Sequence, residues 1–274
     1  MAESAVTVHR DLVYATVGGL DLCLDLYLPE VRPAPLCVWL HGGGWMRGSR
    51  TDRAEQRLLP VARSGVAVAA VQYRLSGQAT FPAPLDDVRA AVRWLRAHAA
   101  ELDLDASRIG VWGASAGGHL AALLALCPDG RDAELGDSSV QAAVTWFPPT
   151  DLLLVGAEVP EGPRPGFLSS PPPSPSFEAR LLGVESVDQA KAEARAASPI
   201  AHVRPDAPPF LLMHGDRDGL LPSVHSRGLA DALRAEGVDA SLMLLAGANH
   251  EDPAFDSPAS LGAVSGFLRA VLLR

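Results

Sequence analysis

Residues 109–118 of the chain read Ile-Gly-Val-Trp-Gly-Ala-Ser-Ala-Gly-Gly, and an apolar run continues from them to residue 126. The apolar residues 109–112 predict a short buried strand, and the segment 116–126 predicts a helix. Ser115 is therefore expected at a sharp turn between a strand and a helix, within the G-x-S-x-G pattern of residues 113–117. Small neighbours let the chain pass through such a strained turn without a steric clash.

This turn has two interpretations. Gly, Ala and Ser are common residues, and a tight strand–helix turn would use them for packing alone. With the strand before it and the helix after it, the pattern favours a nucleophilic serine. The hydroxyl of Ser115 then projects above a helix N-terminus, whose amides favour developing negative charge.

Similar apolar runs lie on both sides of this turn along the chain, at 36–40, 66–71, 140–147, 210–213 and 240–245. They are continuous rather than alternating, as is typical of strands covered by helices on both faces. Helices are predicted between them, for example one after Pro84 and a last one that opens at Ser257-Pro258. This alternation predicts an α/β fold with a mostly parallel, doubly wound sheet.

The N-terminal residues follow a different pattern. Residues 20–28 alternate between apolar and polar side chains (Leu-Asp-Leu-Cys-Leu-Asp-Leu-Tyr-Leu), which predicts a strand with one buried face. The segment 5–14 precedes it across a Gly18-Gly19 turn. We therefore expect these two segments to form antiparallel strands near an edge of the sheet.

Composition limits the classes of partner. The chain has 274 residues, 48% of them hydrophobic, which suits a single α/β domain over 1–274. Its net charge is −9 and it has no run of Lys or Arg, so nucleic acid and anionic membranes are poor partners. The three cysteines form no CxxC pair, so we expect neither zinc nor a disulfide framework. With no signal-peptide pattern and no apolar run of membrane-spanning length, we expect a soluble, cytoplasmic protein.

A glycine-rich loop follows the run at 36–40 and reads His41-Gly42-Gly43-Gly44-Trp45. Consecutive glycines let backbone amides approach a substrate oxygen closely, as an oxyanion hole requires. The alternatives are a simple glycine-rich turn and a phosphate cradle. The phosphate cradle is disfavoured because neither Gly-Lys-Ser/Thr nor Gly-x-Gly-x-x-Gly accompanies this loop. We expect His41 to orient or pack the loop rather than to act as a base.

Two further loops place polar residues at the carboxyl ends of predicted strands, where open α/β sheets build their sites. Residues 214–218 read His-Gly-Asp-Arg-Asp, and residues 247–250 read Gly-Ala-Asn-His. The chain order serine, aspartate, histidine is the one expected for a catalytic triad on such a sheet. His250 is therefore the favoured base for Ser115, and the first of these loops supplies an acid.

One segment interrupts the alternation of strands and helices, the insertion at about 150–200. Residues 156–176 are dense in Pro, Gly and Ser, and residues 177–197 predict a helical segment before the next strand. Composition alone favours a disordered surface loop. Because the insertion leaves the sheet at the carboxyl end of a strand, a small cap or lid over the site is an equally strong hypothesis.

Taken together, these motifs resemble those of serine esterases of the α/β-hydrolase fold, near the feruloyl-esterase-like (BD-FAE) and hormone-sensitive-lipase-like groups. The residues that carry the resemblance are HGGGW at 41–45, YRL at 73–75, GASAGG at 113–118, HGDRD at 214–218 and GANH at 247–250. Hormone-sensitive-lipase-like members usually carry a helical cap before the first strand, whereas strand-like sequence begins here within the first ten residues. The resemblance therefore points to the compact feruloyl-esterase-like group.

The resemblance also implies roles for individual residues. Ser115 is the implied nucleophile and His250 the base, and the family pattern H-G-x-x-D selects Asp218 as the acid. Asp216 is then expected to cap the turn, as aspartates commonly do. The implied oxyanion and substrate-binding residues are Gly43, Gly44 and Ala116 as amide donors, Gly42 as support for the loop, and Trp45 beside it.

These roles imply a serine carboxylesterase that cleaves short-chain acyl or aryl esters of small molecules through an acyl-enzyme, with no metal or cofactor. An arylformamidase-type amidase is the alternative, because that group also carries an H-G-G-x-W loop, here residues 41–45. A non-catalytic binding protein of the same fold is a third interpretation, which the presence of Ser115, Asp218 and His250 disfavours. A homodimer remains open as the oligomeric state.

Other conspicuous residues have structural interpretations. Asp86 and Asp87 open a predicted helix, where carboxylates favour the positive end of the dipole. Asp151 is expected to cap a turn or a helix, with a role in a pocket as the alternative because it follows the end of a strand. Five aromatic residues are expected in the core, with an acyl or alcohol pocket as the alternative: Trp45, Phe81, Trp146, Phe147 and Phe167.

Overall fold

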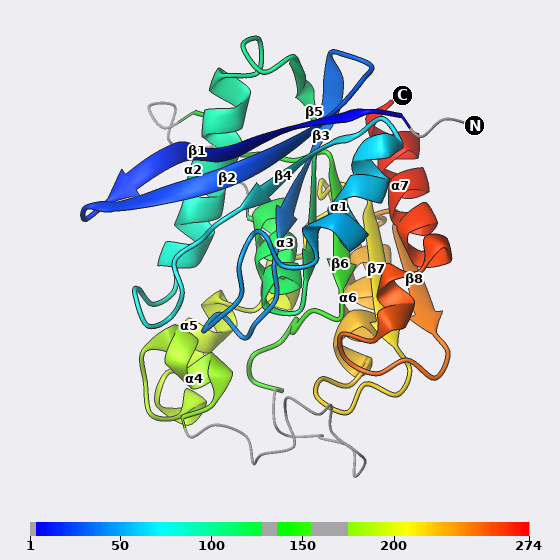
Figure 1. Cartoon of the computed structure of the whole chain (residues 1–274). Coiled ribbons are helices and arrows are strands. Elements are labelled where there is room, and N and C mark those ends of the chain that lie inside the picture. The colour runs from blue at the N-terminus through cyan, green and yellow to red at the C-terminus, as the bar shows by residue number, and fades with distance from the viewer. Residues whose placement is uncertain (1–3, 128–135, 155–174, 274) are drawn as a thin grey trace.

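The computed structural model describes residues 4–127, 136–154 and 175–273. Its strands are β1 (Val6–Val17), β2 (Leu20–Pro29), β3 (Ala34–Leu40), β4 (Ala67–Val71), β5 (Leu104–Ala114), β6 (Ala142–Trp146), β7 (Phe210–Gly215) and β8 (Ala240–Leu245). They form one sheet in the order β1-β2-β4-β3-β5-β6-β7-β8 (Figure 1). The strands β3 to β8 are parallel, and β2 is antiparallel to both of its neighbours. The predicted α/β-hydrolase arrangement is confirmed.

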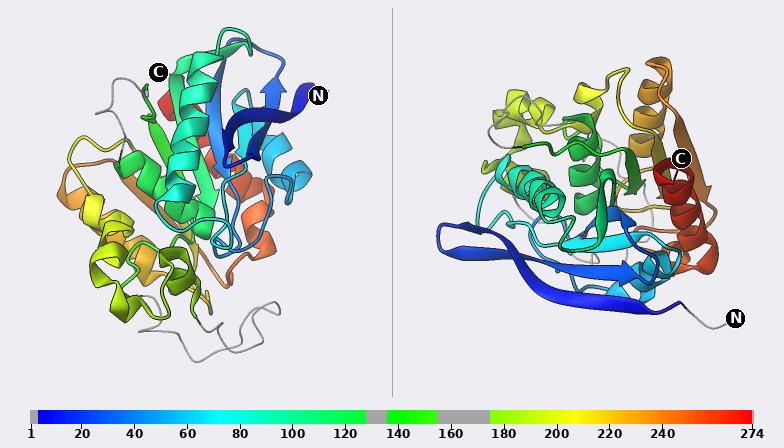
Figure 2. Two further views of the ribbon diagram at one scale, coloured as in Figure 1. Left: turned by 90° about the vertical axis from the view of Figure 1, so that its left-hand side faces the viewer. Right: turned by 90° about the horizontal axis from the view of Figure 1, so that it is seen from above.

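Helices cover both faces of this sheet. The longer ones are α1 (Ala54–Arg63), α2 (Ala83–Ala97), α3 (Ala116–Leu126), α6 (Val224–Ala235) and α7 (Pro258–Leu272). In the view from above in Figure 2, α2, α3 and α6 lie on one face of the sheet, and α1 and α7 lie on the other. Two separate groups of buried side chains, one on each face, follow from this division.

Strand β3 shows why the apolar runs are continuous. Leu36, Val38 and Leu40 pack into the group under α2 and α3, whereas Cys37 and Trp39 pack into the group under α1 and α7. Successive side chains of a strand point to opposite faces, so a strand with helices on both sides needs apolar residues at every position. Because these strands are buried on both faces, the loops that follow them lie in fixed positions at the carboxyl edge of the sheet.

The N-terminal hairpin is formed as predicted, but the expectation of one buried face in β2 is wrong, because Asp25 and Tyr27 are buried as well as the leucines. Strands β1 and β2 are joined by Gly18 and Gly19, whose φ angles of 58° and 82° favour a residue without a side chain. The pairing places Leu24 and Leu26 of β2 in the core. These strands extend the edge of the sheet on the side away from β8 (Figure 1).

The insertion differs in part from its prediction. Residues 177–197 form two short helices, α4 (Phe177–Leu182) and α5 (Lys191–Ala196), with the 3₁₀ turn η2 (Val187–Gln189) between them. The first helix stops at Gly183, whose φ of 73° is a left-handed C-cap. A second 3₁₀ turn, η3 (Pro199–His202), leads back to β7, and a third, η4 (Pro253–Asp256), precedes α7. The Pro-rich stretch predicted over 156–176 lies outside the described residues apart from its last two.

The interpretation of Asp87 as a dipole partner is wrong. Helix α2 already begins at Ala83, so Asp86 lies in its first turn and Asp87 lies beyond it. The buried Asp87 carboxylate instead pairs with Arg74, with 2.6 Å between Oδ1 and Nη2. Its charge is thus balanced by a side chain rather than by the helix terminus.

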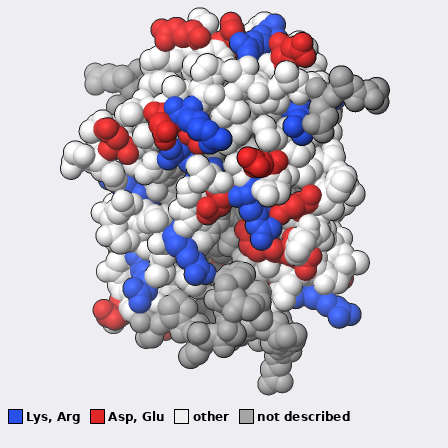
Figure 3. Space-filling view, in the orientation of Figure 1, with Lys and Arg blue, Asp and Glu red and all other residues white. Residues whose placement is uncertain are grey.

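The surface agrees with the charge pattern of the sequence. On the face shown in Figure 3, acidic and basic side chains of the described residues are intermingled. None of the helices within the described ranges is long and apolar enough to cross a bilayer.

Candidate active site

Ser115 lies at the sharp turn between β5 and α3. Its backbone has φ 53° and ψ −119°, a conformation that L-residues rarely adopt and that marks stored strain. The glycines on either side are required sterically. A Cβ on Gly113 would lie 2.2 Å from the carbonyl oxygen of Gly117, and one on Gly117 would lie 2.1 Å from that of Leu40. The G-x-S-x-G pattern is thus what allows the strand to turn directly into the helix.

A chain of hydrogen bonds joins Ser115 to two distant residues. His250 Nε2 lies 3.0 Å from Ser115 Oγ, and His250 Nδ1 lies 2.7 Å from Asp218 Oδ2. His250 and Asp218 are both buried, whereas Ser115 is partly exposed. With Nδ1–H donating to the carboxylate, Nε2 is left to accept the proton of the serine hydroxyl. The three residues predicted as a triad are therefore brought together in the geometry of a nucleophile, a base and an acid.

Asp218 is held as an anion by several donors. The backbone amides of Leu220 and Leu221 donate to its Oδ1, and His214 Nε2 lies 3.3 Å from its Oδ2. Burial by itself raises the pKa of Asp218, but the charge of His250 and the hydrogen bonds from His214 and His250 outweigh it. The pKa of this carboxyl consequently lies well below its ordinary value.

Asp216 has a different partner from the one predicted. Its Oδ1 accepts a hydrogen bond from the amide of Gly247, which belongs to the loop after β8. It therefore links the two loops that carry Asp218 and His250 rather than capping its own turn. Because β7 and β8 are neighbours in the sheet, the loops that follow them meet at this point.

The glycine loop after β3 borders the serine. A Cβ on Gly42 would lie 3.4 Å from Ser115 Cβ, and Gly43 and Gly44 have φ angles of 123° and 62°. Within the described part of the chain, the amides of Gly43 and Gly44 donate no hydrogen bond, although the Gly43 carbonyl accepts two. Ala116 is the first residue of α3, so its amide has no partner within the helix. These three amides are available to a ligand oxygen.

His41 supports this loop. Its ring stacks on Tyr73 with 4.4 Å between centroids, and its Nδ1 lies 2.7 Å from the carbonyl oxygen of Gly42. The Tyr73 hydroxyl donates to the carbonyl of His41 at 2.7 Å. Burial lowers the pKa of His41. These contacts bear out the expectation that His41 packs and orients the loop.

The aromatic residues considered for a pocket lie mostly in the core. Trp45 is buried edge-on to His119, and Trp146 and Phe147 are also buried. Phe81 is partly exposed, and Phe167 lies outside the described residues. A different aromatic side chain reaches the site: a Cβ on Gly44 would lie 2.5 Å from the ring of Phe177 in α4.

Several residues around the site were not singled out in the sequence. His214 is the first residue of the H-G-D-R-D motif. Its position four residues before Asp218 could have indicated that it lies near the acid. Glu251 follows His250 immediately, and its carboxylate pairs with Arg57 of α1. Arg57 occupies the buried side of an amphipathic helix, which is an unusual place for a charge.

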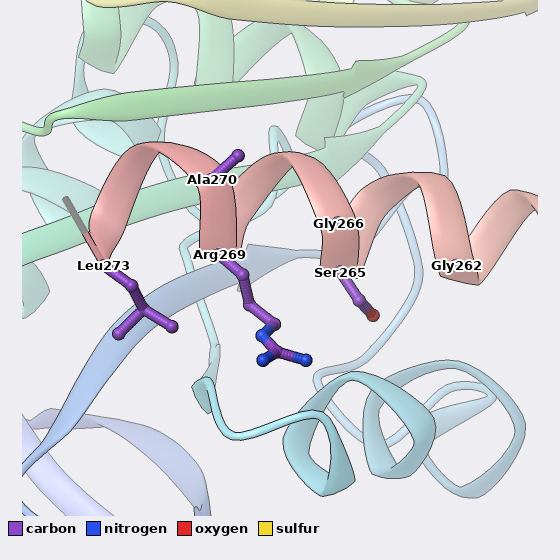
Figure 4. A pocket seen from close by; sticks show the side chains of 6 residues that line it. All are labelled: Gly262, Ser265, Gly266, Arg269, Ala270 and Leu273. Atoms are coloured by element: carbon purple, nitrogen blue, oxygen red, sulfur yellow. The ribbon is translucent and has the colours of Figure 1, made fainter.

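No cluster of metal-ligating side chains occurs in the ranges that the structure describes. A surface hollow of about 550 Å³ lies along the outer face of α7, lined by Gly262, Ser265, Gly266, Arg269, Ala270 and Leu273 (Figure 4). The end of this helix packs near the start of β5, where Arg108 Nη1 donates to the carbonyl of Leu272. Ser115, Asp218 and His250 are not among the residues that line the hollow.

Comparison with known proteins identifies the family of the chain. The sequence model of the BD-FAE family matches residues 24–233, which is most of the sheet and the elbow. The chain belongs to the BD-FAE family. The predicted resemblance is thereby confirmed.

This BD-FAE member is also similar to curated proteins of Mycobacterium tuberculosis. It is 31% identical to the probable carboxylic ester hydrolase LipM, over 81% of this chain and 50% of LipM. It is 32% identical to the esterase LipQ, over 93% of this chain and 60% of LipQ. The chain thus spans about half the length of the curated relatives it matches.

Solved structures resemble this BD-FAE member over nearly its whole length. A truncated carbohydrate esterase from gut microbiota has a TM-score of 0.86 at 25% identity, covering 100% of this chain and 99% of the other. A propionate-bound thermophilic esterase from Thermogutta terrifontis has a TM-score of 0.74 at 28% identity, covering 98% and 94%. These relatives are esterases and lend no support to the arylformamidase alternative.

Proposed function

We propose that this protein is a serine carboxylesterase that hydrolyses short-chain acyl or aryl esters. The observation that carries the proposal is the hydrogen-bonded chain from Ser115 through His250 to Asp218, which begins at a strained elbow. Esterase activity among the relatives named above supports the same class of reaction.

In the proposed first step, His250 Nε2 takes the proton of the Ser115 hydroxyl while Oγ attacks the carbonyl carbon of the ester. The carbonyl oxygen gains the electron pair of its π bond and becomes an oxyanion. The amides of Gly43, Gly44 and Ala116 donate hydrogen bonds to it, and each such donor contributes about 3 kcal/mol in the transition state.

The tetrahedral intermediate then collapses and breaks the bond to the alcohol. The alcohol oxygen receives the proton held by His250, and the acyl group stays on Ser115. A water molecule next gives a proton to His250 and attacks the acyl carbon. The bond between this carbon and Ser115 Oγ then breaks, His250 returns the proton to Oγ, and the carboxylic acid leaves. In both steps Asp218 keeps Nδ1 protonated and stabilises the imidazolium.

We further propose that the chain forms one domain in which α4 and α5 belong to a cap over the site. The support is the contact of Phe177 with Gly44, which sets an aromatic ring beside a proposed oxyanion donor. We expect this ring to favour small acyl groups over bulky ones. The Thermogutta terrifontis esterase, which carries propionate in one structure and butyrate in another, is consistent with this expectation.

The test is turnover of p-nitrophenyl acetate, butyrate and octanoate, with N-formylkynurenine as the amide substrate. We expect release of p-nitrophenol from the two shorter esters and slower reaction with octanoate. Labelling by a fluorophosphonate, followed by mass spectrometry, should place the adduct on Ser115. Faster turnover of N-formylkynurenine than of every ester would replace the proposal with an amidase, and an unlabelled Ser115 would remove the mechanism.

A further inference from the structure

Arg57 is a buried charge beside the candidate site. It projects from α1, and only 3% of its side chain is exposed. Its guanidinium lies over two tryptophans, 5.4 Å from the ring centroid of Trp39 and 4.9 Å from that of Trp146. A buried charge is retained only where oppositely charged partners compensate it.

Both acidic partners of Arg57 come from the segment that follows His250. Arg57 Nε donates to Asp256 Oδ1 at 2.7 Å, and Arg57 Nη2 donates to Glu251 Oε2 at 3.2 Å. Asp256 has a second guanidinium, since Arg53 Nη1 lies 2.6 Å from its Oδ2. Among the described residues, the ion pair of Glu251 is the one with Arg57.

Glu251 reaches the glycine loop. Its backbone has a φ of 53°, which turns the chain sharply just after His250. A Cβ on Gly42 would lie 3.2 Å from Glu251 Oε1 and 3.4 Å from Ser115 Cβ. The carboxylate therefore borders the same space as the serine and the loop whose amides face the proposed oxyanion.

A negative charge in this place opposes the reaction. The tetrahedral intermediate of the proposed mechanism is an anion, and a like charge a few ångströms away raises its energy when water is largely excluded. The Glu251 carboxylate is only 22% exposed, so solvent screens it incompletely. The guanidinium of Arg57, with Nη2 3.2 Å from Glu251 Oε2, reduces this repulsion.

We propose that Arg57 is a positioning residue that holds the Glu251 carboxylate against the His250 segment and neutralises it beside the oxyanion loop. This inference rests on the proposed esterase function. It assigns Arg57 to transition-state stabilisation through Glu251, rather than to the stability of the fold alone.

The test compares Arg57→Met with the double variant Arg57→Met/Glu251→Gln, using p-nitrophenyl acetate. Methionine keeps an apolar stem over Trp39 and Trp146 and removes the charge. We expect kcat of Arg57→Met to fall by about tenfold or more, with KM little changed, because the oxyanion then faces an unbalanced carboxylate. The double variant should recover most of this loss, because it removes that carboxylate as well.

Arg53→Met is the matched control. Arg53 also pairs with Asp256, but 48% of its side chain is exposed and its ion pair is with Asp256 rather than Glu251. Its loss should leave kcat close to that of the wild type. Inhibition by an arylboronic acid, whose serine adduct is anionic, should weaken in Arg57→Met and recover in the double variant.

A double variant as slow as Arg57→Met, at a normal melting temperature, would show that Arg57 acts only through packing and would overturn the inference. If Arg57→Met is unfolded, Arg57→Lys decides, because it keeps the charge and should retain kcat within about threefold. A folded Arg57→Lys that loses tenfold or more would also overturn it. A wild-type protein without esterase activity, by contrast, removes the proposed function itself.

Discussion

The carboxyl edge of the sheet and the α4–α5 segment both lie beside the glycine loop of residues 41–45, but they are held in different ways. Ser115, Asp218 and His250 each follow a strand of one continuous sheet, so their relative positions are set by strand pairing. The α4–α5 segment consists of two short helices held by side-chain packing, with Leu181, Ala194 and Ala197 in the buried group under α2 and α3. The amide of Phe81 donates to the carbonyl of Leu181, and the ring of Phe177 lies against Gly44.

The proposed function therefore assigns catalysis and substrate selection to different regions. In the proposed mechanism, the chemistry that requires hydrogen bonds of 2.7 to 3.0 Å rests on the sheet, and selection of substrates by size is proposed for the α4–α5 segment. Substitutions at the sheet edge should therefore abolish turnover, and substitutions in the α4–α5 segment should change its selectivity.

The largest expected effect comes from Ser115→Ala. It should lower kcat for p-nitrophenyl acetate by about four orders of magnitude, because the nucleophile is lost. The melting temperature should stay near that of the wild type, since the backbone hydrogen bond from the Ser115 amide to Trp146 remains. Turnover above about a hundredth of the wild type, at an unchanged melting temperature, would refute the nucleophile assignment.

Asp218→Asn should come next, with a loss of about a thousandfold in kcat, because an amide at this position favours the wrong tautomer of His250. Asp216→Asn is the matched control on the same loop. It weakens the hydrogen bond to the Gly247 amide and should cost about 1 kcal/mol of the free energy of unfolding, with kcat little changed. Kinetics and urea unfolding of both variants measure this, and the reverse pattern would exchange their roles.

His119 joins the two regions and should make stability depend on pH. It lies on α3 one turn after Ser115, and its Nε2 lies 2.7 Å from the carbonyl oxygen of Ala197 at the end of α5. Burial lowers the pKa of His119 to about 4. The unfolded chain binds a proton below about pH 6.5 that the folded chain does not, so stability is complete above that pH and falls below it.

From this shift, we expect the His119 contribution to the free energy of unfolding to fall by about 2 kcal/mol between about pH 7 and pH 5. His119→Gln keeps a donor for the Ala197 carbonyl and should remove this part of the pH dependence. Urea unfolding at the two pH values measures it, with His9→Gln on the exposed face of β1 as the control. A slope identical to that of the wild type would mean that His119 is not buried in its neutral form.

The smallest effect is expected from Phe177→Ala. It removes the ring beside Gly44 and should change kcat/KM for p-nitrophenyl octanoate relative to acetate by about two- to fivefold in favour of the longer ester. Acetate hydrolysis should stay within about twofold of the wild type. Phe267→Ala on α7 is the control for losing a partly buried ring elsewhere. An unchanged ratio of the two esters would leave the α4–α5 segment without a role in selectivity.

Motif order and apolar periodicity predicted much of this molecule correctly. The continuous apolar runs predicted the parallel strands, and the strand–serine–helix pattern predicted the sharp turn at Ser115. The choice of Asp218 over Asp216 came from the family pattern, and the structure brings Asp218 to His250. The predicted role of Asp87 failed because its partner Arg74 is thirteen residues away in the chain, and periodicity contains no information about such a pair.

The sequence by itself determined the layered fold and the residues that meet at the carboxyl edge of the sheet, because alternation, apolar runs and strand–helix turns are local properties of the chain. Only the tertiary structure decided which charged side chains form ion pairs and which side chains pack together. Arg57 is 194 residues from Glu251 in the chain, and Phe177 contacts Gly44 in the loop after β3. Such contacts depend on how separate elements pack, so no local pattern records them.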